Sequence, residues 1–299
     1  MSRLFRRCFC LLLLLLVGLG GCLMSPATDP VAWTIWRGER RAVVAGTNGW
    51  TTIVGLFWLD EGRSSVGTAP GSLIRFEPDA APPSIGYLIR RNGSVRYEPT
   101  AGISATIDHR AITSEVELTS DVPGPASILR VGRLELWVIV RGDRIGLRVR
   151  DREALARRQF HGLEYFPWRS EWQVHGHFEL HPAGKTVAIT DVTGVTQFEA
   201  NPGVLVFDYS GVQYRLEALT DPEAGDLFVL FKDTTNGETT YSPGRFMHVS
   251  LPDAAGRAVL DFNRAYNPPC AFTEFATCPR PPATNRLPFP VPVGERKYR

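Results

Sequence analysis

Short runs of β-branched and aromatic residues, separated by turn-forming residues, recur along most of the chain. Such short runs favour β-strands, and the Gly, Pro and Asn residues between them favour turns. This pattern is typical of antiparallel sheets. The first run covers residues 49–62, is apolar on both faces and predicts a buried strand; further runs cover residues 72–76, 85–90, 94–98, 103–108 and 111–118. We therefore expect a mainly β fold, a single antiparallel β-barrel or β-sandwich-like domain with few short helices. One such helix, amphipathic and lying on the domain, is predicted where Trp33, Trp36, Val43 and Val44 recur.

The clearest hairpin joins residues 133–141 to residues 144–150 through Gly142-Asp143. In its second strand apolar residues alternate with arginines, so that Arg144, Arg148 and Arg150 share one face. This face is either a solvated outer surface or a cationic wall for an anion. Asn-Gly pairs at residues 92–93 and 236–237 predict two further hairpin turns.

The N-terminus is typical of a lipoprotein leader. Arginines precede an apolar core in residues 9–19, and Leu19-Gly20-Gly21-Cys22 follows, which resembles a bacterial lipobox. We therefore predict a signal peptide in residues 1–21 and a lipidated Cys22 with its tether in residues 22–32. A single β-rich domain is expected in residues 33–295 and a basic tail in residues 296–299.

The location and partners follow from this leader. Lipidated Cys22 would hold the chain on a membrane of the cell envelope, facing the periplasm or the exterior. Leu23 in place of an aspartate favours the outer membrane if the cell is Gram-negative. Cleavage removes three arginines and no acid, which leaves 30 of the 33 basic residues against 31 acidic ones. The mature chain has no excess of positive charge, so nucleic acid is not an expected partner.

The segment of residues 261–287 is rich in proline, asparagine and aromatic residues. Prolyl rings restrict their own backbone and that of the preceding residue, so an irregular, rigid C-terminal segment is predicted. The segment also contains Cys270 and Cys278, which are left after the leader cysteines and Cys22 are set aside. We expect a disulfide between them in an oxidising envelope, with two reduced structural thiols as the alternative. Their spacing is poor for zinc, and no metal site is predicted.

Several of these motifs together resemble the bacterial and archaeal domain-of-unknown-function family numbered 1684. They lie in residues 49–62, 148–151, 160–167, 231–246 and 261–287, and the last of them is the most specific. The resemblance covers most of residues 33–295. It implies no activity, cofactor or catalytic residue. Arg280 stands where a small apolar residue is expected in relatives.

Common catalytic signatures are absent from the sequence: there is no Gly-x-Ser-x-Gly, P-loop, His-Glu-x-x-His or Cys-x-x-Cys. Polar residues nevertheless gather near the C-terminus, where an arginine beside Tyr and Asn donors suits a carboxylate or phosphate. The ligand-binding candidates are Asp233, Tyr241, Arg245, Asn263, Tyr266, Asn267 and Asn285. The alternative is structural: Arg245 pairs with Asp233 or Asp261, and the asparagines cap irregular backbone.

Three functions remain open. We favour an envelope lipoprotein that binds a small or lipid-like ligand in a β-rich pocket, beneath the C-terminal segment. The alternatives are a novel enzyme with a polar site of Tyr241, Arg245 and Asn267, and a scaffold protein with an exposed apolar patch and no ligand. The sequence names no cofactor and no ligand.

Overall fold

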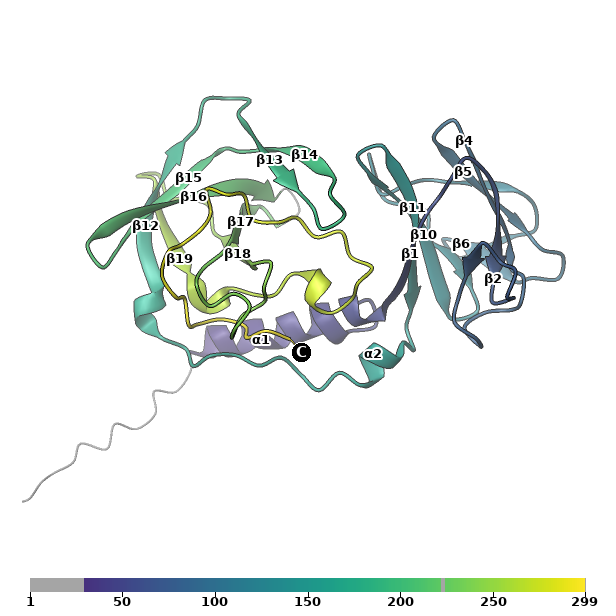
Figure 1. Cartoon of the computed structure of the whole chain (residues 1–299), viewed down its shortest axis with the longest axis horizontal. Coiled ribbons are helices and arrows are strands. Elements are labelled where there is room, and N and C mark those ends of the chain that lie inside the picture. The colour runs from purple at the N-terminus through teal and green to yellow at the C-terminus, as the bar shows by residue number, and fades with distance from the viewer. Residues whose placement is uncertain (1–29, 222–223, 299) are drawn as a thin grey trace, which may run out of the picture.

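A computed structural model describes residues 30–221 and 224–298, so the predicted signal peptide and Cys22 lie outside the described residues. Figure 1 shows two β lobes side by side, with helix α1 (Val31–Ala45) running beneath one and leading into the other. The first lobe comprises residues 53–151 and the second comprises residues 172–221 and 224–298. The predicted mainly β, antiparallel fold with few helices is confirmed. The range expected to be one β-rich domain contains both lobes.

The first lobe packs two sheets against each other. In its described residues, one sheet has the strand order β1-β11-β10-β9-β6-β7 and the other β3-β2-β4-β5-β8. The strands of the first sheet are β1 (Ile53–Trp58), β6 (Ala105–Ile107), β7 (Arg110–Ile112), β9 (Leu129–Val131), β10 (Leu134–Arg141) and β11 (Arg144–Asp151). Those of the second are β2 (Gly62–Gly67), β3 (Ile74–Arg75), β4 (Gly86–Arg91), β5 (Ser94–Pro99) and β8 (Val116–Leu118).

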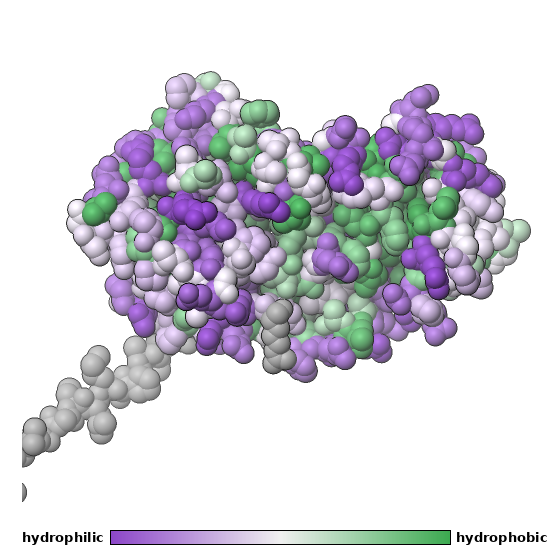
Figure 2. Space-filling view, viewed as in Figure 1, coloured by the Kyte–Doolittle hydropathy of each residue, from purple (hydrophilic) through white to green (hydrophobic). Residues whose placement is uncertain are grey.

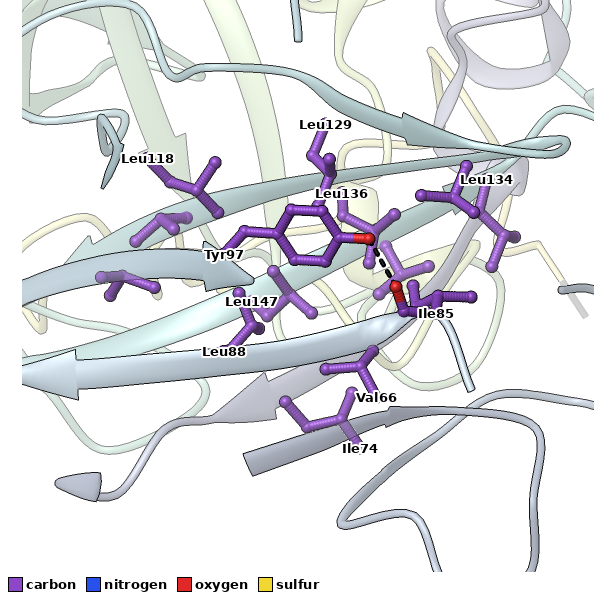
Figure 3. Close-up of a cluster of buried hydrophobic side chains, with 14 of the residues drawn as sticks. Val66, Ile74, Ile85, Leu88, Tyr97, Leu118, Leu129, Leu134, Leu136 and Leu147 are labelled. Carbon is purple, nitrogen blue, oxygen red and sulfur yellow. Dashed lines mark hydrogen bonds between the residues drawn. The ribbon is translucent and has the colours of Figure 1, made fainter. Parts of the chain in front are cut away.

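Alternating residues of these two sheets meet in one hydrophobic core. Figure 3 shows Leu88, Leu136 and Leu147 around the ring of Tyr97, which is fully buried. The Tyr97 hydroxyl donates a hydrogen bond to the Ile85 carbonyl at 2.6 Å, so the ring carries no unsatisfied polar atom into the core. Burial raises the pKa of Tyr97 to about 12, which keeps the hydroxyl protonated at any physiological pH.

The second lobe is built on one long sheet with the strand order β18-β17-β16-β15-β12-β19 and a separate β13-β14 hairpin, as far as the chain is described. The strands are β12 (Gln173–Leu180), β13 (Thr186–Thr190), β14 (Thr196–Ala200), β15 (Gly203–Tyr209), β16 (Val212–Asp221), β17 (Asp226–Phe231), β18 (Arg245–Val249) and β19 (Arg257–Asp261). Its core continues into the C-terminal segment, because Leu287, Val291 and Val293 pack in the same buried cluster as the sheet.

Short helical turns connect these elements. They are η1 (Trp50–Thr52), α2 (Leu155–Arg158), η2 (Ser170–Trp172), η3 (Phe262–Arg264) and η4 (Pro269–Ala271). Beyond η4 the described chain has no strand and no helix up to residue 298, as its prolines predict. None of the helices in the described part of the chain has the length and apolar character needed to cross a membrane.

Two hairpin predictions can be compared with the strand register. Asn92 and Gly93 join β4 to β5 with φ angles of 50° and 83°, the left-handed backbone that this two-residue turn requires. β17 and β18 pair antiparallel as expected, but Asn236-Gly237 belongs to a local turn within the long connection of residues 232–244 and is not a two-residue hairpin turn.

The predicted basic tail is held by the fold in its described part. The backbone N–H of Arg296 donates to the Glu164 carbonyl and that of Lys297 to the Thr239 carbonyl. The ring of Tyr298 stacks on Phe160 with centroids 5.8 Å apart. These contacts hold residues 296–298 against the loop that links the two lobes and against the β17–β18 connection of the second lobe.

Candidate functional site

A large cavity along the described residues lies between the lobes and has a volume of about 1040 Å³. Its walls come from β1, β3, β10 and β11 of the first lobe, from α2, and from residues 270–275 of the C-terminal segment. Figure 2 shows the molecule hollowed between the lobes, with apolar side chains gathered in the hollow. A cavity of this size suits a ligand as large as a drug molecule or a lipid chain.

The inside of the cavity is mainly apolar. β1 is hydrophobic on both faces: Ile53, Val54, Leu56 and Phe57 all line the cavity, and Val54 and Phe57 also pack against the core of the first lobe. The turn η4 brings two aromatic rings of the C-terminal segment over it, and Thr273 Oγ1 donates to the Ile53 carbonyl at 2.9 Å. The larger apolar side chains of the lining are Ile53, Val54, Leu56, Phe57, Phe76, Leu134, Val149, Leu155, Phe272 and Phe275.

Charged side chains border this lining. Arg133 pairs with Asp151 at 2.9 Å, so that pair is internally neutralised. Arg75 and Arg158 also line the cavity, and both are exposed. Glu77 and Glu274 are exposed there as well. The cavity therefore combines an apolar interior with a rim of both charge signs, an arrangement that suits an amphiphile better than a fully polar ligand.

The predicted pair of Asp233 and Arg245 forms, but it is sealed inside the second lobe. Arg245 Nη2 lies 2.8 Å from Asp233 Oδ2, and both side chains are fully buried. The guanidinium also donates to the carbonyls of Val291 at 2.8 Å and Val293 at 2.5 Å. Burial lowers the pKa of Arg245, while Asp233 opposes this shift. Arg245 thus clamps the C-terminal segment to β18 instead of facing a ligand.

The three predicted asparagines are also buried and bonded to the protein. Asn263 donates to the Arg169 carbonyl at 2.9 Å, and Asn285 donates to the carbonyls of Glu217 and Leu230 at 2.8 and 2.9 Å. Asn267 donates to the Arg296 carbonyl at 2.7 Å. These contacts match the structural alternative, in which asparagines satisfy irregular backbone.

The two predicted tyrosines lie in different surroundings. Burial raises the pKa of Tyr241 to about 12, so its hydroxyl is not a base near neutral pH. The Tyr266 hydroxyl is 2.8 Å from Nε2 of His248, which the sequence reasoning did not select. None of the seven predicted ligand-binding residues lines the large cavity.

The predicted disulfide is not formed: Cys270 and Cys278 are both free thiols. They are neighbours, however, because the Cys270 backbone N–H lies 3.0 Å from Cys278 Sγ and the Cys270 thiol donates to the Ala276 carbonyl at 3.4 Å. The hydrogen bond with Cys278 lowers the pKa of Cys270 and raises that of Cys278. The short loop is thus closed by hydrogen bonds, as the alternative of two reduced thiols expects.

The arginine face of β11 is neither uniformly solvated nor a cationic wall. Arg144 lies over the Trp58 ring at 3.7 Å, and Arg150 pairs with Glu135 at 3.1 Å. Arg148 is only 6% exposed and its Nη2 donates to Thr277 Oγ1 at 3.2 Å. Burial lowers the pKa of Arg148 to about 10. This face is covered in part by the C-terminal segment, which strand alternation alone does not reveal.

The cavity residues were missed because no motif connects them. They come from the beginning, the middle and the end of the chain, and most are apolar, so each one looks like an ordinary core residue in its own strand. The available signal was the hydrophobicity of β1 on both faces, since a strand of a two-sheet sandwich needs only one.

Among solved structures, the chain is similar to an uncharacterized protein of Haloarcula marismortui, whose structure was determined by solution NMR. The two chains are 33% identical, and the match covers 47% of this chain and 78% of that one, with a TM-score of 0.39. A family described as a protein of unknown function (DUF1684) matches residues 158–296. The chain belongs to this family. No curated protein matches it.

The DUF1684 match is shorter than the range of 33–295 expected from the sequence. It begins at the last residue of α2 and contains the second lobe with the C-terminal segment as far as residue 296. The first-lobe wall of the large cavity therefore lies outside the DUF1684 match, whereas residues 270–275 lie within it.

Proposed function

We propose that this protein is a lipid-anchored envelope protein that binds an amphiphilic, lipid-like ligand in the cavity between its lobes. The observation that carries the proposal is the cavity itself: about 1040 Å³, apolar inside, and bordered by the C-terminal segment. Apolar surface that stays exposed to water in a cavity is unfavourable, and an acyl chain placed there would gain about 25 cal/mol for each Å² it buries.

The charged rim of the cavity would contact the polar end of the ligand. Arg75 and Arg158 offer cations at the edge of an apolar interior, where a carboxylate or phosphate head group would stay close to water. The leader supports a position beside such ligands, since Leu19-Gly20-Gly21-Cys22 would anchor the mature chain to a membrane surface. The cavity also favours this function over a scaffold without a pocket.

The test is native mass spectrometry of the full chain, released from detergent micelles and compared with its denatured mass. Acyl groups on Cys22 are covalent and persist in the denatured mass, whereas a ligand in the cavity is lost. We expect the native protein to carry one additional lipid mass and to bind a dansylated fatty acid with increased fluorescence. No lipid mass and no fluorescence change would overturn the cavity proposal.

A matched pair of variants locates the ligand. Ala156 is exposed and lines the cavity, so Ala156→Trp should place an indole in it and reduce fatty-acid binding by at least about 10-fold, the equivalent of 1.4 kcal/mol. Ala101 is exposed on a turn of the first lobe away from the cavity, and Ala101→Trp should bind like wild type. Equal binding by both variants would place the ligand elsewhere.

A further inference from the structure

Three metal-ligating side chains converge at one end of the sheet in the second lobe. Asp221 ends β16, Asp226 begins β17, and His248 lies on β18. Their nearest ligand atoms all lie within 4.8 Å of one another. His248 Nδ1 is 3.0 Å from Asp226 Oδ1 and 3.9 Å from Asp221 Oδ2. Imidazole nitrogen and carboxylate oxygen are both common zinc ligands, so the cluster has the composition of a metal site.

The strand register brings these residues together. Asp221 pairs directly with Asp226 across β16 and β17, and His248 pairs with Phe228 across β17 and β18. Asp226 and Phe228 are two residues apart on one strand, so they share a face and His248 lies diagonal to Asp226. Two carboxylates placed directly opposite each other repel, and a cation between them would remove that repulsion.

The second nitrogen of His248 is already held. Its Nε2 is 2.8 Å from the Tyr266 hydroxyl, and the two rings are nearly parallel, with an interplanar angle of 2°. Tyr266 is in turn covered by the Arg40 guanidinium, 4.5 Å from the ring centroid. When Nε2 donates to the tyrosine oxygen, the Nδ1 lone pair faces the carboxylates. Metal-binding histidines are usually oriented in this way by a partner on the other nitrogen.

The cluster is accessible from solvent. The side chains of Asp221, Asp226 and His248 are 27%, 24% and 34% exposed, which allows an ion to enter. Asp221 also borders a second cavity of about 280 Å³, together with Arg141 and Thr277. Three protein ligands beside a cavity leave coordination positions open for water or another ligand, as in many catalytic zinc sites.

We propose that Asp221, Asp226 and His248 bind one Zn²⁺-like divalent cation through one nitrogen and two carboxylate groups, with Tyr266 positioning the imidazole. The site is separate from the apolar cavity and does not depend on the lipid-binding proposal. A nitrogen ligand and only two carboxylates suit Zn²⁺ better than Ca²⁺ or Mg²⁺, which prefer shells of oxygen. Sequence spacing gives no hint of the site, because its ligands come from three strands.

The test is isothermal titration of the full chain, untagged and treated with a chelator, with ZnCl₂ in detergent solution. We expect one Zn²⁺ per chain, and no comparable binding of MgCl₂ or CaCl₂. His248→Gln and Asp226→Asn should each weaken Zn²⁺ binding at least about 10-fold. Tyr266→Phe keeps the ring but removes the hydroxyl, and should weaken binding by about 10-fold to 100-fold.

Two controls separate this site from other histidines. His181 pairs with Glu217 at 2.8 Å on the same lobe, and His175 and His177 are exposed on β12. His181→Gln and the double variant His175→Gln/His177→Gln should bind Zn²⁺ like wild type. Wild-type affinity in His248→Gln, or loss of binding in a control, would overturn the proposal.

Visible absorption of bound Co²⁺ tests the identity of the ligands without a measurement of affinity. Co²⁺ in place of Zn²⁺ should give visible absorption bands of a low-coordinate site, and Asp221→Asn should change or abolish them. Circular dichroism of each variant without metal should match wild type, because the cluster is partly exposed and ends a sheet. A Co²⁺ spectrum that is identical in wild type and Asp221→Asn would exclude Asp221 as a ligand.

Discussion

At the scale of single residues, buried charged side chains hold segments of the second lobe together. Asp233 and Arg245 are fully buried in contact with each other, and Arg40 on α1 reaches the equally buried Glu295 at 2.7 Å. Glu295 Oε2 also accepts from the Asn267 backbone N–H at 2.9 Å. A buried ion pair costs desolvation energy, and breaking one by removing a single partner is strongly destabilising. These groups therefore fix how the C-terminal segment docks and add little to net stability.

The pH dependence of stability tests the state of Glu295. Burial raises its pKa above the ordinary 4.5, and Arg40 offsets this only in part. The native state then holds a proton that the unfolded chain releases, so the free energy of unfolding falls as pH rises from about 4.5 through the raised pKa. The difference in unfolding free energy between wild type and Glu295→Gln should fall over this window, as measured by urea unfolding. A difference that rises with pH would show that Arg40 dominates.

At the scale of elements, the amphipathic pattern of α1 agrees with the contacts that the helix makes to residues far away in the sequence. Its apolar face carries Trp33 and Val44, both buried, and Trp33 Nε1 donates to the Asn263 carbonyl at 3.0 Å. The predicted amphipathic helix lying on the β fold is thus observed. Most of its stability comes from this packing, because a helix of 15 residues is marginal by itself.

Gly38 lowers the stability of α1, and a substitution by alanine should raise it. It is exposed, its backbone is helical, and a Cβ added there would meet no atom within 4 Å. Gly38→Ala should raise the free energy of unfolding by about 0.5–1 kcal/mol, since alanine favours the helix. Gly244→Ala is the matched control with the opposite sign: Gly244 has φ of 128°, and a Cβ would lie 2.6 Å from Pro281 Cγ. Thermal and urea unfolding measure both, and a destabilised Gly38→Ala would contradict this account of α1.

At the scale of the whole molecule, the C-terminal segment joins the lobes. It belongs to the core of the second lobe through Val291 and Val293, yet Thr273 bonds to β1 and Thr277 to β10 and β11 of the first lobe. The large cavity lies beside these same contacts. The segment that closes the second lobe therefore also forms one wall of the proposed ligand site.

Thr277 provides a test of this connection. Its Oγ1 accepts from Arg141 Nε at 3.1 Å and from Arg148 Nη2 at 3.2 Å. Thr277→Val leaves the buried Arg148 guanidinium without this acceptor, so stability should fall by about 1–3 kcal/mol and amide exchange in residues 270–278 should accelerate. Thr100→Val, which removes an exposed hydroxyl bonded to Ser84, should have little effect. Equal stability of the two variants would show that the lobes are held together elsewhere.

The sequence by itself determined the local features of this protein: the strands of the 133–150 hairpin, the Asn92-Gly93 turn, the amphipathic α1 and the irregular C-terminal segment. Each depends on backbone preferences and side-chain alternation over a few residues, which the chain carries in any context. The family was also visible, because its motif is a continuous stretch of sequence.

Only the tertiary structure decided the rest. It turned Arg245 and the asparagines inward, covered Arg148, left the two thiols free and opened a cavity between segments far apart in the sequence. It also placed Asp221, Asp226 and His248 at one point. Burial and convergence depend on which distant segment packs on which face, and the periodicity of one strand specifies that it has two faces without specifying what covers each.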